Sequence, residues 1–481
     1  MTEESLTRRD FLKRAVLAVT GIVGLSLSRF FKKVAGDHHL HSRKWSSKST
    51  SQYSGTDMKY DVIIVGCGMA GAVAGLTALK NGLSVCIVEK KEREFIGRKI
   101  CGEMIPESVV GWLHQEFNLS IDCHLLRGLE IRSSSGHASR ITEPTCMVNR
   151  WKVGQTMLEN LLDKGADIYR GYVKRPILES SVKGVETEDS TFKGTVTIDC
   201  SGVTSVLRRN LLPEHQVLGL AYKRDLILDK PVEMEYGILL LDKTILPSGY
   251  MWCFPKSEYV LNVGVGGMGQ SGISLEENLE KAVEALNIKS NVKGRELSGF
   301  GLVPLGRPLP SMVYPGFLTC GDAASHVNPL TGGGISPAVT AGYLAANVSK
   351  EAVENNDVSP KGLWQYNCDF AKGYGIKHAA LTAARDFLVS LSDEELDYFL
   401  VNVVSDDDLY QLMRGKIPFQ DKGTSEIFLD NWRSPVLLYK MYRAFRLIQR
   451  IRSHYARYPG GPEGFPAWRE TLDQYLNPHK R

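Results

Sequence analysis

An acidic residue ends a short apolar stretch late in the chain, and a glycine-rich turn follows it. Gly321-Asp322-Ala323-Ala324 comes directly after the apolar run 316–320, and the segment Pro329–Ile335 precedes a predicted helix over 336–349. A carboxylate placed there can accept a hydrogen bond from a hydroxyl, and the free N–H groups of the helix N-terminus can bind a phosphate or a flavin edge. Alone, this pattern is also consistent with a tight structural turn.

A second glycine motif lies near the start of the chain. The apolar run 60–65 predicts a buried strand, Gly66-Cys67-Gly68-Met69-Ala70-Gly71 follows it, and 72–80 has the pattern of a helix. A second apolar strand over 85–88 ends in Glu89, 18 positions after Gly71, about where a ribose-binding acid belongs. The glycines permit a tight turn and the close approach of a pyrophosphate. Together the two motifs predict that FAD, rather than NAD, is the cofactor.

Composition and charge narrow the class of protein. The 481 residues are 43% hydrophobic and 23% charged, as in ordinary globular proteins, and the length predicts two to four domains. The net charge of +4 is carried by residues 1–36, and the rest of the chain has none, which argues against a nucleic-acid partner. None of the nine cysteines forms a CxxC pair, so no metal site is predicted.

The N-terminus resembles a twin-arginine export signal. Arg8 and Arg9, followed by Phe11-Leu12-Lys13, precede an apolar segment over 15–27, which is shorter than the roughly 20 residues of a membrane span. A basic amphipathic helix is the alternative. We expect export of the folded protein to the periplasm or the outer face of the cytoplasmic membrane, with the leader either cleaved or kept as an anchor.

Two further segments have the residue types of a substrate site. Cys101-Gly102 combines a thiol with a position at which backbone can approach a ligand closely. Tyr250, Trp252 and Phe254 are spaced by two, so in a strand all three side chains point to one face. That face is either a ligand-binding wall or part of the core; the flanking prolines and the glycine-rich run 262–267 favour a ligand cavity.

These motifs together resemble the geranylgeranyl reductase family of FAD-dependent, hydroxybenzoate-hydroxylase-like flavoproteins. The resemblance covers roughly residues 60–350, and Pro247–Pro255, which matches PxxYxWxFP, is its most specific element. Ser325-His326 departs from the family, in which a glycine often stands there, and would change the polarity beside the flavin ring. The export leader is also unexpected for a lipid-biosynthetic enzyme. By the resemblance, FAD would contact the following residues: Gly66, Gly68, Ala70, Gly71, Glu89, Cys101, Gly102, Arg150, Asp322, Gly334 and Ile335.

The predicted fold is α/β, with a Rossmann-like FAD-binding domain, an inserted antiparallel β-sheet substrate domain and a helical C-terminal region. Apolar residues at helical spacing over 437–451 are interleaved with basic ones, which is consistent either with a membrane-surface helix or with a helix packed on the core. The predicted ranges are a leader over 1–36, a linker over 37–58, the FAD domain over 59–215 and 299–355, the substrate domain over 216–298 and the helical domain over 356–481.

The function that this pattern predicts is FAD-dependent reduction of C=C bonds in a long isoprenoid lipid. Cys101 is a candidate proton donor or a support for the flavin edge, Tyr250 is its rival as donor, and Tyr250, Trp252 and Phe254 would hold the substrate. The electron donor is unidentified, and contact with a membrane surface is expected. The alternatives are an FAD-dependent monooxygenase or epoxidase acting on an apolar substrate, and a membrane-associated flavoprotein that passes electrons to quinone.

Overall fold

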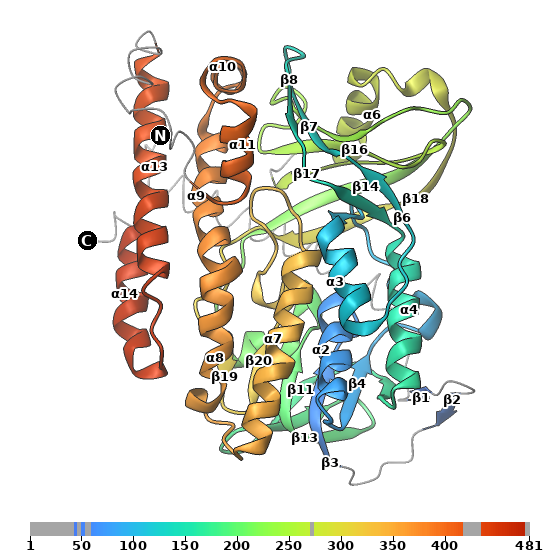
Figure 1. Cartoon of the computed structure of the whole chain (residues 1–481), viewed down its shortest axis with the longest axis vertical. Helices are drawn as coiled ribbons and strands as arrows, with labels where there is room; N and C mark the ends of the chain where they lie inside the picture. Colours follow the sequence, from blue (N-terminus) through green and yellow to red (C-terminus); the bar gives the residue numbers. More distant parts are fainter. Residues whose placement is uncertain (1–42, 46–49, 53–58, 270–273, 417–433, 477–481) are drawn as a thin grey trace, which may run out of the picture.

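The structure places two β-sheets one above the other, with a layer of helices along one side of both (Figure 1). This computed structural model describes residues 43–45, 50–52, 59–269, 274–416 and 434–476. The arginine pair and apolar segment of the leader lie outside the described residues, as do parts of the linker.

The lower sheet is built on parallel strands. Their order is β20-β13-β3-β4-β10, and the central strands β3 and β4 are mostly apolar and buried because both faces of the sheet are covered. The short pair β1 (Arg43–Trp45) and β2 (Thr50–Gln52), within the predicted linker, extends this sheet at the edge of β10. The five parallel strands are β3 (Lys59–Val65), β4 (Val85–Glu89), β10 (Asp167–Arg170), β13 (Thr191–Asp199) and β20 (Phe317–Thr319).

Helices α2 (Met69–Lys80), α4 (Arg150–Asp163) and α7 (Ile335–Glu354) form a hydrophobic core on one face of this sheet. Helices α2 and α7 cross closely, because a Cβ at Gly342 would lie 2.3 Å from the carbonyl oxygen of Ala70. The opposite face packs against α5 (Val206–Leu211), and the antiparallel pair β11 (Arg175–Leu178) and β12 (Val182–Glu186) extends the same sheet from β13. This arrangement brings the N-termini of α2 and α7 to the same side of the molecule.

The upper sheet has seven strands in the order β18-β14-β17-β16-β15-β7-β8, antiparallel except for the pair β15–β7. One face is covered by α6 (Leu275–Ala285), and the other faces the C-terminal helices. Strands β7 and β8 come from the range 59–215, which the sequence assigned to the FAD domain. The strands are β7 (Gly128–Ser133), β8 (Ala138–Ile141), β14 (Leu218–Leu228), β15 (Tyr236–Leu241), β16 (Gly249–Ser257), β17 (Val260–Met268) and β18 (Val292–Pro304).

A small sheet joins the two large ones. It is made of β5 (Met104–Pro106), β9 (Thr145–Val148) and β6 (Cys123–Leu126), and α3 (Glu107–Phe117) follows β5. Strand β5 begins just after Cys101-Gly102, so the loop that carries these two residues runs between the two large sheets.

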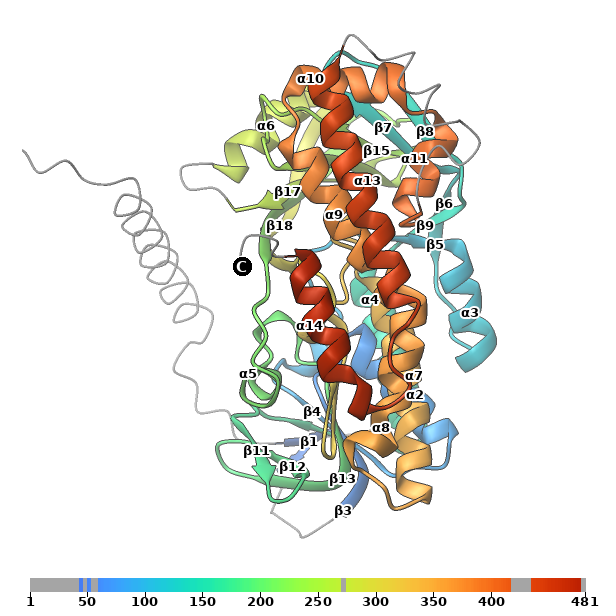
Figure 2. The same cartoon turned by 90° about the vertical axis from the view of Figure 1, so that its left-hand side faces the viewer.

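The C-terminal region is helical, as the sequence predicted, and the described residues 360–416 and 434–476 contain no strand. The apolar stripe of α13 packs against α9 and leaves Leu437, Met441 and Ile448 buried, so this stripe belongs to the core (Figure 2). The predicted fold class is confirmed. The helices are α8 (Pro360–Phe370), α9 (Ile376–Ser390), α10 (Asp393–Tyr398), α11 (Asp406–Met413), α13 (Pro435–Tyr455) and α14 (Phe465–Leu476). Within the described ranges, no helix has the length and apolar character that crossing a membrane requires.

Candidate active site

The turn between β3 and α2 leaves a helix N-terminus open to a ligand. Gly66 has φ +97°, and a Cβ at Gly71 would lie 1.9 Å from the carbonyl oxygen of Gly66, so both positions require glycine. A Cβ at Gly68 would meet nothing within 4 Å. Gly68 is also the N-cap of α2; it makes no side-chain cap, and the first turn has no acidic residue. The backbone N–H groups there suit a pyrophosphate.

Glu89 ends β4 beside this turn and is held in place by backbone donors. Its Oε2 accepts a hydrogen bond from the Cys67 N–H at 2.7 Å, and its Oε1 accepts one from the Lys91 N–H at 2.8 Å. The side chain is buried, and each oxygen keeps acceptor capacity for a ribose hydroxyl.

Asp322 lies where the late glycine motif meets α7. A Cβ at Gly334, the N-cap of α7, would be 3.6 Å from Asp322 Oδ1, and this cap also has no side-chain partner. Lys99 Nζ lies 2.5 Å from Asp322 Oδ2, so an ion pair joins this motif to the loop that carries Cys101.

His326 does not line the cavity, whereas the sequence led us to expect it beside the flavin ring. Its ring is fully buried and stacks on Phe370 at 3.8 Å, and its Nδ1 accepts a hydrogen bond from the Gly321 N–H at 3.1 Å. Burial, with His378 nearby, holds the pKa of His326 well below its ordinary value, so the ring is neutral. His326 therefore supports the Gly321–Ala324 turn from the core side.

The Cys101 loop is held from both sides. The Sγ of Cys101 accepts from the Glu103 N–H at 3.4 Å and lies 3.8 Å from Arg150 Nη1. Arg150 is buried and lines the cavity, and its Nε has no partner among the described residues. A Cβ at Gly102 would lie 3.1 Å from the ring of Phe254, so the loop backbone rests directly on that ring.

The three aromatic side chains of β16 share one face, as predicted. Trp252 and Phe254 are buried among the residues that face the C-terminal helices, whereas the intervening Met251 and Cys253 face α6. A Cβ at Gly264 of β17 would lie 2.1 Å from the Trp252 ring, so this glycine gives the indole room to lie flat on the neighbouring strand. The aromatic face is thus both packed core and cavity wall.

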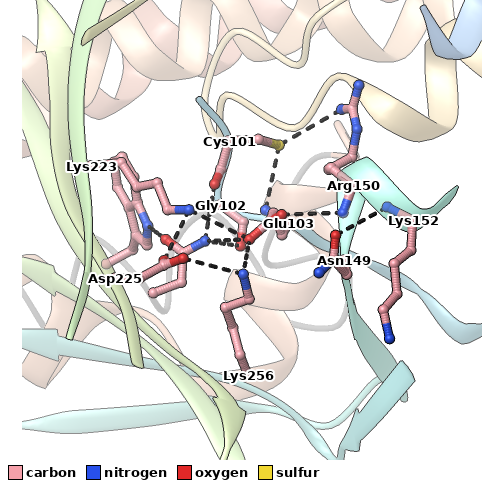
Figure 3. Close-up of polar contacts among 11 residues, drawn as sticks. Cys101, Gly102, Glu103, Asn149, Arg150, Lys152, Lys223, Asp225 and Lys256 are labelled. Carbon is pink, nitrogen blue, oxygen red and sulfur yellow. Dashed lines mark hydrogen bonds and ion pairs between the residues drawn. The ribbon is translucent and has the colours of Figure 1, made fainter. Parts of the chain in front are cut away.

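Glu103 is the centre of a buried charge cluster that sequence reasoning missed (Figure 3). Its carboxylate lies 2.7 Å from Lys256 Nζ and 3.5 Å from Lys223 Nζ, and Asp225 pairs with both lysines at 3.3 and 2.9 Å. Burial alone would raise the pKa of Glu103, but the two lysines and the Arg150 N–H offset it and hold that pKa below its ordinary value. The signal available in the sequence was the Lys-Arg-Asp run inside the apolar strand β14.

Asn262 connects this cluster to the aromatic wall. Its Oδ1 accepts from Trp252 Nε1 at 2.9 Å, while its Nδ2 donates to the carbonyl oxygens of Cys101 at 3.0 Å and Gly102 at 3.2 Å. The same Nδ2 lies 3.2 Å from Glu103 Oε2. One buried amide therefore fixes the thiol-bearing loop against the indole.

The two glycine motifs, the Cys101 loop with Glu103, and the aromatic face of β16 border one cavity of about 730 Å³. Its lining includes every residue that the resemblance placed at FAD except Gly71, which lies behind the turn, and it also includes Tyr250, Trp252 and Phe254. Two uncapped helix N-termini, two placed carboxylates and the unpartnered Arg150 Nε fit a dinucleotide with a flavin ring.

Comparisons with known proteins agree with this geometry. Residues 61–210 match the FAD dependent oxidoreductase family, and residues 220–297 match the geranylgeranyl reductase catalytic domain. A digeranylgeranylglycerophospholipid reductase of Sulfolobus acidocaldarius is 27% identical over 87% of this chain and 98% of its own length. A reductase of the same name from Thermoplasma volcanium is 29% identical over 72% of this chain and 92% of its own.

Solved structures show the same fold. A geranylgeranyl bacteriochlorophyll reductase-like protein from Thermoplasma acidophilum superposes with a TM-score of 0.66, at 24% identity, over 80% of this chain and 99% of its own. The chondrochloren halogenase, an FAD-dependent enzyme of myxobacteria, gives 0.57 at 17% identity, over 82% and 97% of the two chains. The protein is therefore an FAD-dependent oxidoreductase.

Replacing Asp322 by Ala should weaken FAD binding by about tenfold or more, because a hydroxyl of the bound cofactor would lose a charged acceptor. Titration of the apoprotein with FAD, followed by flavin absorbance, measures this. Lys99→Met is the matched control: it removes the ion pair but keeps the carboxylate, so it should retain the flavin. Full flavin content and affinity in Asp322→Ala would refute the role of Asp322.

Glu103→Gln should lower the free energy of unfolding by about 3 kcal/mol at pH 7, because it leaves two buried lysines with one carboxylate. The folded pKa of Glu103 lies below its unfolded value, so its contribution is present above about pH 4.3 and is lost as the pH falls through the folded value. The difference between wild type and variant in urea denaturation should therefore shrink in acid.

A matched control for this variant is Glu130→Gln. Glu130 is also a buried carboxylate paired with two cations, but its partners Arg132 and Arg140 are 37% and 60% exposed. Its loss should cost about 1 kcal/mol or less. If the two variants lose the same free energy of unfolding, the buried Glu103 cluster contributes no more to stability than the exposed Glu130 pairs.

Proposed function

We propose that this protein uses FAD to reduce C=C bonds of a long-chain isoprenoid lipid. One observation carries the proposal: the Cys101 loop and the aromatic face of Tyr250, Trp252 and Phe254 line the same cavity as the two dinucleotide motifs. The match to the geranylgeranyl reductase catalytic domain and the names of the relatives support the same reaction.

An isolated alkene offers no polar group, so its binding must come from burial and shape. Burial of apolar surface contributes about 25 cal/mol per Å². Trp252 cannot tilt freely, because its ring lies on Gly264 and its Nε1 is bound to Asn262. A wall that is fixed in this way can hold one alkene in one register beside the Cys101 loop.

Bound FAD, when reduced, would supply the hydride. The chain must then provide a proton for the other alkene carbon, and the two candidates differ in their surroundings. The Tyr250 hydroxyl donates a hydrogen bond to the carbonyl oxygen of Thr331, and burial, with Cys101 nearby, raises the pKa of Tyr250. The Cys101 sulfur instead accepts a hydrogen bond from the Glu103 N–H and lines the cavity, so its S–H can be directed at the substrate. Cys101 is therefore the proposed donor.

Cys101→Ser should retain FAD and slow alkene reduction by about 100-fold, the usual weight of a general acid. Anaerobic turnover of geranylgeranyl substrates with a chemical reductant, followed by mass spectrometry, measures this. Cys253→Ala is the control, since that thiol lies on the opposite face of β16. If Tyr250→Phe is inactive while Cys101→Ser keeps the wild-type rate, the donor is Tyr250. Turnover that requires oxygen would favour the monooxygenase alternative instead.

We also propose that the folded protein is exported and works at the outer face of the cytoplasmic membrane. The twin-arginine leader supports export, although it lies outside the described residues. In addition, the sulfurs of Cys123 and Cys146 lie 2.8 Å apart on neighbouring strands. Thiol–disulfide exchange with an oxidising partner could therefore join these two cysteines with little movement, and such oxidation is typical of compartments outside the cytoplasm. A membrane or protein carrier, rather than soluble NADPH, would then donate the electrons.

The outer face of α13 supports contact with a membrane surface. Val436, Tyr439 and Tyr442 are 60%, 61% and 55% exposed on this helix. Arg443 and Arg446 lie over the two tyrosine rings, at 5.7 and 5.5 Å from the ring centres. Aromatic and cationic side chains on one exposed face suit the headgroup region of an anionic bilayer. This face is distinct from the apolar stripe that packs against α9.

Replacing Arg8 and Arg9 together by lysine should reduce the exported fraction to nearly zero, because the export route reads the arginine pair. Cell fractionation and thiol alkylation with mass spectrometry measure this: Cys123 and Cys146 should resist alkylation only in the exported protein. Arg14→Lys, which keeps the pair, should change neither readout. Unchanged fractionation of the double variant would contradict the export proposal.

A further inference from the structure

The cavity continues past the aromatic wall, between the seven-stranded sheet and the C-terminal helices. Leu239 and Leu241 line it from the sheet side, and Met413 lines it from the helix side. Two cations also line this part: Lys377, in the first turn of α9, and Arg414, the C-cap of α11. Figure 1 shows α9 and α11 side by side here.

Two other cations that line the cavity already have partners. Lys243 Nζ donates to the carbonyl oxygens of Leu388 and Val389 at 2.8 and 3.0 Å, and so caps the C-terminal end of α9. Arg385 donates to the carbonyl oxygen of Leu305 and, through Nε, to Asp386 at 2.9 Å. Both side chains are therefore already held by acceptors within the protein.

Lys377 differs from these two. Across the described ranges, its ammonium group has no hydrogen-bond or ion-pair partner, although it is partly buried. Burial lowers its pKa, and the positive charge of Arg414 lowers it further, while Glu143 acts in the opposite sense. A cation withdrawn from water without a partner is costly, and a bound anion would remove that cost.

Arg414 is held beside Lys377: its Nη1 donates a hydrogen bond to the Tyr410 hydroxyl at 2.5 Å, and its ion pair with Glu143 is loose. Gly415 packs on Lys377: a Cβ there would lie 2.8 Å from the Lys377 carbonyl oxygen, and its φ of +66° suits the turn that ends α11. Arg414 Nη1 is 3.7 Å from Glu143 Oε1, and both side chains are almost half exposed, so an anion can replace that contact. The local charge of Lys377, Arg414 and Glu143 is one positive unit.

We propose that Lys377 and Arg414 form a subsite for the phosphate of the lipid substrate. The inference rests on the proposed isoprenoid reductase function and specifies the substrate as an anionic, phosphate-bearing lipid. With its phosphate at this mouth, the isoprenoid chain runs along Leu239 and Leu241 toward Tyr250 and Trp252. The headgroup then fixes how deep the chain enters, which the apolar wall alone cannot do.

The test uses non-reducible probes, so that binding is separated from turnover. Phytanyl phosphate and phytanol are saturated, differ only in the phosphate, and can be titrated into oxidised holoenzyme while the flavin absorbance is followed. Lys377→Met should lower the affinity for phytanyl phosphate by about tenfold or more and leave the affinity for phytanol unchanged. Lys377→Arg should recover most of the affinity. Lys372→Met is the control, since that exposed lysine lies nearby in the chain but does not line the cavity.

Three outcomes would overturn the subsite. If Lys377→Met weakens the binding of both probes equally, Lys377 has only a structural role. If the wild-type protein binds phytanyl phosphate no more tightly than phytanol, the protein makes no contact with the phosphate. Inorganic phosphate that binds as tightly as phytanyl phosphate would indicate a general anion site. If Lys377→Met selectively loses phytanyl phosphate but the wild type reduces no isoprenoid, the subsite stands and the proposed reductase function falls.

Discussion

The position of the candidate active site depends on one buried set of opposite charges. Glu103, Lys223, Asp225 and Lys256 are largely withdrawn from water, which is tolerable only while each has a partner. Glu103 belongs to the Cys101 loop of the nucleotide-binding part, whereas the other three belong to the seven-stranded sheet. If the loop shifted away from the sheet, the buried lysines would keep only one of their two carboxylate partners. The cluster therefore fixes the thiol loop relative to the sheet and, through Asn262, relative to Trp252.

Close packing then gives the cavity its shape. Gly102 rests on the Phe254 ring and Gly264 on the Trp252 ring, so a side chain at either glycine would push an aromatic ring into the substrate space. The wall contributes apolar area rather than hydrogen bonds, because Trp252 Nε1 and the Tyr250 hydroxyl are already paired within the protein. Selectivity against polar substrates follows from this.

The C-terminal helices provide the third side of the cavity. Helices α9 and α11 bring cations to the end remote from the dinucleotide motifs, while α13 supports α9 from behind with the stripe that contains Leu437 and Met441. A cavity that is apolar along the aromatic wall and lined by cations beyond it suits an amphiphile better than a hydrocarbon. The exposed face of α13 lies on the outside of the same helical layer, where a membrane surface would present such an amphiphile.

Local chemistry made much of this protein predictable from its sequence. The turn at Gly66–Gly71, the acid Glu89 at a strand end and the period-two spacing of Tyr250, Trp252 and Phe254 depend on residues close in the chain, and the structure has the turn, the strand end and the shared face. Partners distant in sequence were not predictable. An amphipathic helix shows that one face is buried but not against what, so only tertiary structure assigned the α13 stripe to the core. His326 follows a cofactor motif, yet packing turned it toward Phe370. Glu103, Asn262 and Lys377 belong to no sequence motif. The role of each depends on contacts with residues more than 30 positions away, which only folding brings together.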